Sequence, residues 1–253
     1  MKTVVKDKLT VEIYDTREQM GKAAGEKAAE IIKNLLSQKE VVNIIFAAAP
    51  SQNEMLKTLV NTSDIEWERV NAFHMDEYIG LPADAPQGFG NFLKDRIFEK
   101  LPFKTVNYID CTAKNIEAEC ERYSDLLKKN PVDIVLLGIG ENGHIVFNDP
   151  HVADFNDPET VKSVSLDDIC RQQQVNDGCF ENIEHVPKYA LTLTIPTLFS
   201  AKCLVCTVPA ATKAWAVGRT VNGEINEECP ATVMRNHNSA IMFCDSDSGS
   251  ELL

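Results

Sequence analysis

The chain has no run of basic residues, and this absence excludes one large class of partner. Its 253 residues carry 25 Lys and Arg against 38 Asp and Glu, a formal net charge of -13. A protein that binds nucleic acid needs a surplus of cations on some surface, so we expect no nucleic-acid partner. A small anion remains compatible with this charge, because a few local cations and backbone amides can bind one phosphate group.

The chain also lacks a membrane-spanning apolar run, an N-terminal signal region and a Pro-, Gly- or Ser-rich linker. We therefore expect a cytoplasmic protein without membrane contact, folded as a single domain over residues 1–253. Its eight cysteines are scattered without dense spacing, which favours reduced thiols. Cys203 and Cys206 have CxxC spacing, but they lie in an apolar run and are predicted to be buried in a strand.

Helix and strand signals alternate along the chain. Thr16 and Gln19 form a capping-box pattern, and apolar residues at spacings of three and four follow it. Residues 41–49 are almost continuously apolar, as expected for a strand covered on both faces. Alternating elements of this kind predict an α/β fold with a doubly wound, mostly parallel sheet and helices on both faces. Further strands are predicted at 70–73, 132–137, 189–195, 203–208 and 240–244, and further helices from about 52, at 89–100, at 116–127 and after 211.

The predicted strand 132–137 runs into a glycine-rich turn that carries His144. In parallel sheets such turns converge over the carboxyl edge, where ligands bind. Asn142 and Asp149 are near enough in sequence to orient the imidazole. Residues 138–143 also match G-x-G-x-x-G, but Pro150 follows too soon for the long helix of a nicotinamide-dependent oxidoreductase. The spacing of His144, Asp149 and His151 fits no recognised metal site, so no metal is predicted.

Asp76 and Glu77 directly follow the predicted strand 70–73. Because parallel strands end at one sheet edge, we expect both acids near His144. A carboxylate becomes a useful base when burial raises its pKa towards the working pH. Gly140 and Gly143 would let the backbone approach a ligand.

Two segments, 75–78 and 140–150, resemble the signature segments of the glucosamine-6-phosphate deaminase (isomerase) family. Segments 186–192 and 230–237 resemble it too, and the similarity covers nearly the whole chain. The related 6-phosphogluconolactonases share a Gly-His turn, but not its continuation Ile-x-Phe-Asn-(Glu/Asp)-Pro. The resemblance implies conversion of glucosamine 6-phosphate and water to fructose 6-phosphate and ammonia, without a metal or organic cofactor.

The resemblance also implies roles for single residues. Asp76 would move a proton between C2 and C1, and His144, oriented by Asp149 and Asn142, would assist ring opening. Lys213 would contact the sugar phosphate. The substrate-binding set is expected to include Ser51, Gln52, Glu77, Gly140, Gly143, Arg171 and Lys213.

The sequence departs from the family in several places. Many members carry Asp at the position of Asn142 and Glu at that of Asp149. The usual Gly-Gly/Ser-Thr phosphate turn is replaced by Ala-Ala-Ala-Pro-Ser-Gln-Asn at 47–53, where Ser51 and the amides of the following helix could bind an anion. A lid is expected within 151–187, with Arg171 as the nearest candidate for the family's lid arginine.

Several alternatives remain at this point. The substrate could be another epimer, such as galactosamine 6-phosphate. The fold could serve a non-catalytic sugar-phosphate-binding regulator, or a lactonase that releases no ammonia. A homo-oligomer is possible. The chain ends at Leu253 without the C-terminal extension that contributes to allosteric control in hexameric members, so we expect no such control.

Overall fold

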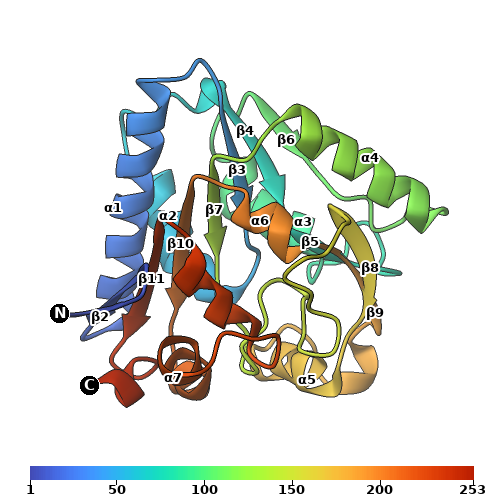
Figure 1. Cartoon of the computed structure of the whole chain (residues 1–253). Helices are drawn as coiled ribbons and strands as arrows, with labels where there is room; N and C mark the ends of the chain where they lie inside the picture. The colour runs from blue at the N-terminus through green and yellow to red at the C-terminus, as the bar shows by residue number, and fades with distance from the viewer.

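The computed structural model describes residues 1–253 and contains a central eight-stranded sheet of order β1-β2-β11-β10-β7-β3-β4-β6 (Figure 1). All neighbouring pairs run parallel except β1 and β2. The prediction of a doubly wound, mostly parallel sheet is therefore confirmed. Its strands are β1 (Lys2–Lys6), β2 (Leu9–Tyr14), β3 (Val42–Phe46), β4 (Val70–His74), β6 (Thr105–Asn107), β7 (Ile134–Leu137), β10 (Cys203–Val208) and β11 (Ala240–Asp245).

Helices cover both faces of this sheet, as expected. Their bounds are α1 (Arg17–Leu36), α2 (Asn53–Val60), α3 (Phe89–Leu93, continued by a π-turn over Lys94–Phe98), α4 (Ile116–Lys129), α5 (Asp168–Asn176), α6 (Ile195–Phe199) and α7 (Ala214–Asn222). Alternate strand residues point to opposite faces. Ile44 and Phe46 of β3 thus pack in the core with α1, α2 and α3, whereas Ile45 packs in the core with α4, α6 and α7.

The start of α1 follows the predicted cap. The Thr16 hydroxyl accepts a hydrogen bond from the Gln19 amide at 3.2 Å, which satisfies one of the free amides of the first turn. This cap fixes where Arg17, the first residue of α1, leaves the loop after β2. No helix in the structure combines the length and the apolarity needed to cross a membrane.

A second, antiparallel sheet of order β5-β9-β8 lies beside the main one (Figure 1). Its strands are β5 (Asp76–Tyr78), β9 (Tyr189–Leu193) and β8 (Val161–Ser165). The predicted strand 189–195 therefore belongs to this small sheet and stops at Leu193, because Pro196 occupies the first turn of α6. Asp76, expected just beyond the end of a strand, is itself the first residue of β5. The segment 151–187, within which a lid is expected, contains β8 and α5.

Candidate active site

A cavity opens at the carboxyl edge of the main sheet. The loops after β3, β4, β7 and β10 line it together with the first residue of α1 and one side of α5. Of the residues singled out in the sequence, six line this cavity: Ser51, Gln52, Asp76, Gly140, His144 and Lys213. As expected from the strand ends, residues from distant parts of the chain lie together at this edge.

Asp76 is buried, with 7% of its surface exposed, and its side chain lines the cavity. Burial, and then the charge of Glu77, raises its pKa well above the ordinary value. A carboxylate in this state holds protons more readily than an exposed one. It has the property required of a general base that works near neutral pH.

The backbone of Asp76 is held by a buried histidine. The Ile109 amide donates to His74 Nε2 at 2.8 Å, so Nε2 is unprotonated and Nδ1 carries the proton. Nδ1 then donates to the Asp76 carbonyl oxygen at 3.0 Å. Burial lowers the pKa of His74 to about 4. This histidine is therefore a neutral support that fixes the strand end, and no signal in the sequence distinguished it from a catalytic one.

Glu77 points away from the cavity. Its carboxylate accepts hydrogen bonds from the backbone amides of Tyr78, Phe89 and Gly90 at 2.9, 3.0 and 2.8 Å. Burial raises the pKa of Glu77, and these three amides oppose the shift. The structure therefore places Glu77 at the start of α3, where it joins β5 to that helix.

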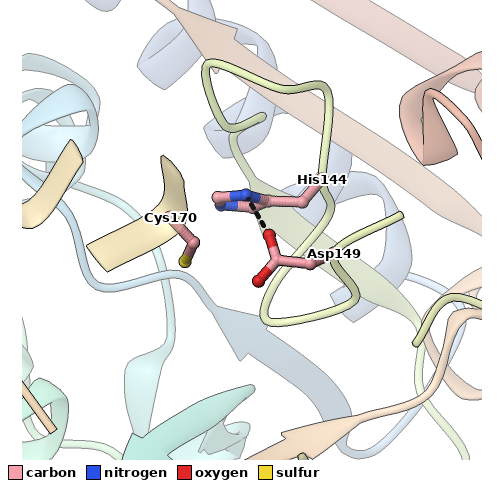
Figure 2. A group of neighbouring side chains, drawn as sticks. All are labelled: His144, Asp149 and Cys170. Carbon is pink, nitrogen blue, oxygen red and sulfur yellow. Dashed lines mark ion pairs between the residues drawn. The ribbon is translucent and has the colours of Figure 1, made fainter. Parts of the chain in front are cut away.

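His144 lies against Asp149, with 2.9 Å between Nδ1 and Oδ1 (Figure 2). Asn142 links the two residues: its Nδ2 donates to Asp149 Oδ1 at 3.1 Å, and its Oδ1 accepts from the His144 amide at 3.0 Å. Burial acts to raise the pKa of Asp149, but its interactions with His144 and Asn142 outweigh burial and the pKa lies below its ordinary value. Asp149 is thus a buried, ionised partner for the imidazole, and neither it nor Asn142 lines the cavity.

Two glycines make this loop possible. A Cβ at Gly140 would lie 2.2 Å from His144 Cε1, so a side chain there would displace the ring. Gly143 has φ +81°, and its Cβ would meet the Cys229 sulfur at 2.3 Å. Gly140 lines the cavity, whereas Gly143 packs behind it. Both glycines serve the placement of His144.

Lys213 also lines the cavity, from a short 3-10 turn after β10. Its Nζ is buried and has no hydrogen-bond partner, and burial lowers its pKa. Gln52 is also fully buried; its Nε2 donates to Ser51 Oγ at 3.0 Å, while its Oε1 has no partner. Unpaired buried polar atoms at a cavity wall are suited to bind a polar ligand.

Arg17 also lines the cavity, although no sequence motif marked it. Its Nη2 donates to the Pro50 carbonyl oxygen at 2.5 Å and its Nε to Glu54 at 2.9 Å. These bonds fix the guanidinium beside the loop that carries Ser51. Only the packing of α1 against α2 brings it there, and a sequence without alignment contains no sign of that contact.

Arg171 does not line the cavity. Its guanidinium donates to Asp168 at 3.1 Å and to the carbonyl oxygens of Ile183 and Val186 at 2.6 and 3.2 Å. The side of α5 that faces the cavity instead presents Gln173, Gln174 and Asp177. No sequence motif marks these three residues, because α5 is largely polar and its sequence has weak helical periodicity.

Side-chain contacts tie α5 to the loop after β7, residues 138–150, which carries His144. The Glu141 amide donates to Gln173 Oε1 at 2.9 Å, and Asn142 Nδ2 lies 3.3 Å from Asp167 Oδ2. Asp167 also caps α5 by accepting from the Cys170 amide at 2.6 Å. The segment expected to form a lid therefore covers one wall of the cavity in this conformation.

The site around the cavity thus combines a buried carboxylate, a His–Asp pair and an unpaired ammonium. These groups are typical of an enzyme that uses acid–base catalysis on a small anionic substrate. Residues 15–243 match the family described as "Glucosamine-6-phosphate isomerases/6-phosphogluconolactonase". The chain belongs to this family.

Similar proteins agree with that assignment. Glucosamine-6-phosphate deaminase of Listeria innocua is 35% identical over 230 residues, 91% of this chain and 96% of the relative. The Bacillus cereus strain B4264 protein of the same name is 33% identical over 242 residues, 95% and 88% of the two chains. Among solved structures, a monomeric glucosamine-6-phosphate deaminase has a TM-score of 0.87 and 29% identity over 95% of this chain and 99% of its own. A 6-phosphogluconolactonase from Thermotoga maritima has a TM-score of 0.77 at 18% identity, over 94% and 100%, and shares the fold.

Proposed function

We propose that this protein converts glucosamine 6-phosphate and water to fructose 6-phosphate and ammonia. The observation that carries the proposal is the presence of Asp76 and His144 on one cavity that also contains the unpaired Lys213 ammonium. An aldose–ketose isomerisation needs a base beside C2 and C1, and ring opening needs an acid–base group beside O5. Relatives that carry the deaminase name support the same reading.

The chemistry assigned to each side chain follows from its surroundings. His144, held by Asp149, gives a proton to the ring oxygen O5 and accepts one from the C1 hydroxyl, which opens the pyranose. Asp76 takes the proton from C2 and returns it to C1, so the aldose becomes a ketose-type imine at C2. Water adds to that imine, and ammonia leaves from C2. Atoms and charge balance without an external oxidant or reductant.

The phosphate is assigned to the end of the cavity with Lys213, Ser51, Gln52 and Arg17. Lys213 and Arg17 supply the cationic charge, and Ser51 and the Gln52 side-chain amide supply neutral polar contacts. This arrangement replaces a glycine-rich phosphate turn with side chains. We also propose that α5 acts as the expected lid, since Gln173 lines the cavity and accepts a hydrogen bond from the Glu141 amide. Glu141 belongs to the loop 138–150, here called the catalytic loop. Arg171 is left out of the substrate-binding set, because it does not line the cavity and its Nη1 and Nη2 bind Asp168 and two carbonyl oxygens within the segment.

Two alternatives are less well supported. A lactonase hydrolyses an ester and needs no base that removes a proton from carbon, so the buried Asp76 carboxylate would have no role in the reaction. A sugar-phosphate-binding regulator would need neither Asp76 nor the His144–Asp149 pair, and burying such groups without use is costly.

A panel of hexosamine phosphates distinguishes these possibilities. Glucosamine, galactosamine and mannosamine 6-phosphates would each be incubated with the protein, with ammonium and fructose 6-phosphate measured together. Equal release of both from glucosamine 6-phosphate is expected. Ammonium from another epimer alone would change the substrate, and hydrolysis of 6-phosphogluconolactone without ammonium release from any epimer would refute the proposal. Binding without any turnover would favour the regulator.

A further inference from the structure

Three buried groups with metal-binding atoms meet beside the cavity. His144, Asp149 and Cys170 each offer one such atom, and these atoms all lie within 4.8 Å of one another. Figure 2 shows the three side chains converging, His144 and Asp149 from the loop after β7 and Cys170 from α5. We propose that this cluster binds Zn²⁺ and that zinc bound there inhibits the enzyme. The inhibition rests on the proposed function, but the binding does not.

The donor set fits zinc. Imidazole nitrogen, carboxylate oxygen and thiolate sulfur are the three ligand types that Zn²⁺ takes in proteins, usually four in a tetrahedron. All three residues are buried, so a bound ion would exchange only slowly with bulk water. Because His144 lines the cavity, the fourth position can be taken by a water or a ligand oxygen from that side.

The second observation concerns Asp149. Its Oδ2 is buried and has no hydrogen-bond partner, whereas Oδ1 accepts from Asn142 Nδ2 and lies 2.9 Å from His144 Nδ1. A carboxylate oxygen without a donor in a buried site is costly. A cation at this oxygen would remove the cost.

The electrostatic surroundings also favour a cation. Asp149 belongs to the cluster, and Asp167 accepts a hydrogen bond from the Cys170 backbone amide at 2.6 Å. The negative charge of these two carboxylates favours a bound divalent ion. Binding would replace the thiol proton: the S–H bond breaks, a sulfur–zinc bond forms, and the proton leaves to solvent.

A second group of possible ligands, Asp149, His151 and Asp167, is less suitable. His151 is exposed, and its Nε2 already lies 3.2 Å from the Ser165 carbonyl oxygen. Asp167 caps α5 through the Cys170 amide. The sequence spacing of His144, Asp149 and His151 predicted no metal site, whereas the fold brings Cys170 of α5 to His144 and Asp149.

Inhibition follows from the residues that zinc would occupy. A metal on His144 and Asp149 takes the imidazole lone pair and the carboxylate that ring opening requires. Zinc would also join α5 to the catalytic loop through Cys170, which would hold the proposed lid in place. We therefore expect loss of turnover that a chelator reverses.

The test uses the full chain with Zn²⁺ and Co²⁺ as probes. Calorimetry with Zn²⁺ should give one site per chain with release of a proton, and Co²⁺ should produce thiolate-to-cobalt absorption in the near ultraviolet. Cys170→Ser should abolish that absorption and weaken Zn²⁺ binding by at least about tenfold. Removing a residue that only hydrogen-bonds to a metal ligand already costs about tenfold in affinity, and loss of a ligand should cost at least as much. Cys179→Ser, a half-buried thiol just beyond α5 and outside the cluster, is the matched control and should behave as the wild type.

Retention of the cobalt–thiolate absorption in Cys170→Ser, or no zinc binding by the wild type, would overturn the proposal. If Cys170→Ser does not fold, His144→Gln serves instead, and unchanged zinc affinity in that variant would be equally decisive against it. The inhibition is read as the ratio of ammonium release with and without Zn²⁺ for each variant. Zinc binding as described, with no ammonium from any hexosamine phosphate, would refute the proposed function and leave the metal site standing.

Discussion

Replacing Asp76 by Asn should make the protein more stable and almost inactive. The Asp76 carboxyl is buried with a pKa well above its ordinary value, because burial and the nearby Glu77 both disfavour its charge. A neutral amide of the same shape removes that cost. Single stabilising substitutions commonly contribute about 0.5–2 kcal/mol. For a chain of this length each kcal/mol raises Tm by about 2–4 °C.

The pH dependence of this gain has a definite sign. A carboxyl whose folded pKa is raised binds more protons in the folded state, so its ionisation costs stability as the pH rises. Below the unfolded pKa of about 3.9 both states hold the proton and the two proteins should have equal stability. The advantage of Asp76→Asn should then grow as the pH rises through the raised folded pKa and stay constant above it.

Activity should change in the opposite direction. Loss of a positioned base costs about 10²–10⁴ in rate, and exchange of the C2 proton with solvent deuterium should be lost with it. Wild-type activity should fall as the pH drops through the pKa of Asp76, since only the ionised form can accept the proton. Urea unfolding between pH 4 and 8, ammonium release and proton exchange measured by NMR form the assay.

Glu77→Gln is the matched comparison for Asp76→Asn. Glu77 is also buried with a raised pKa, but its two oxygens accept three backbone amides. An amide cannot replace both oxygens as acceptors, so this variant should lose about 1–3 kcal/mol. Equal stability changes in the two variants, or retained C2 exchange in Asp76→Asn, would refute the reasoning.

Three further variants test other parts of the site. Lys213→Ala should raise KM for the sugar phosphate about 10–100-fold, because a hydrogen bond to a charged group contributes a free energy that corresponds to this factor. An unchanged KM in steady-state kinetics would show that the phosphate lies elsewhere. Gly140→Ala should lower kcat at least about tenfold, since its Cβ would lie 2.2 Å from the His144 ring. Gly178→Ala, with φ +75° and no atom near its Cβ, is the control that should alter Tm and leave kcat unchanged. Ala210→Gly should raise the free energy of unfolding in urea by about 1 kcal/mol, because Ala210 has φ 82°, a backbone conformation that is strained for alanine and not for glycine. A lower free energy of unfolding would contradict this.

The main sheet could be predicted because its strands are buried on both faces. β3 and β10 are apolar almost throughout, and each is bounded by helical patterns or turns. Because parallel strands end at one sheet edge, the strand pattern also predicts Asp76 and His144 at the same edge. The positions of both side chains follow from topology.

Other elements depend on contacts between distant parts of the chain. β5 has only three residues, Asp76–Tyr78, and is a strand because β9 pairs with it. α5 is polar and its apolar contacts are few, so its periodicity was weak. Arg17 and Gln173 reach the cavity only through packing of their helices. Local pattern cannot foresee such positions, because tertiary contacts determine them.

The acidic net charge of the chain does not conflict with an anionic substrate. Charges on the protein surface are screened over about 10 Å at 0.1 M salt, so groups inside the cavity decide the affinity. Lys213 is buried there with a lowered pKa and no partner, and the buried Gln52 Oε1 is also unpaired. Both groups lose the free energy of hydration in the free protein and regain interactions only when a polar ligand is present. A phosphate beside Lys213 would restore its pKa, since an opposite charge favours the protonated form. The cost of burying these groups in the free protein is thus the reason to expect that a sugar phosphate both binds and stabilises the fold.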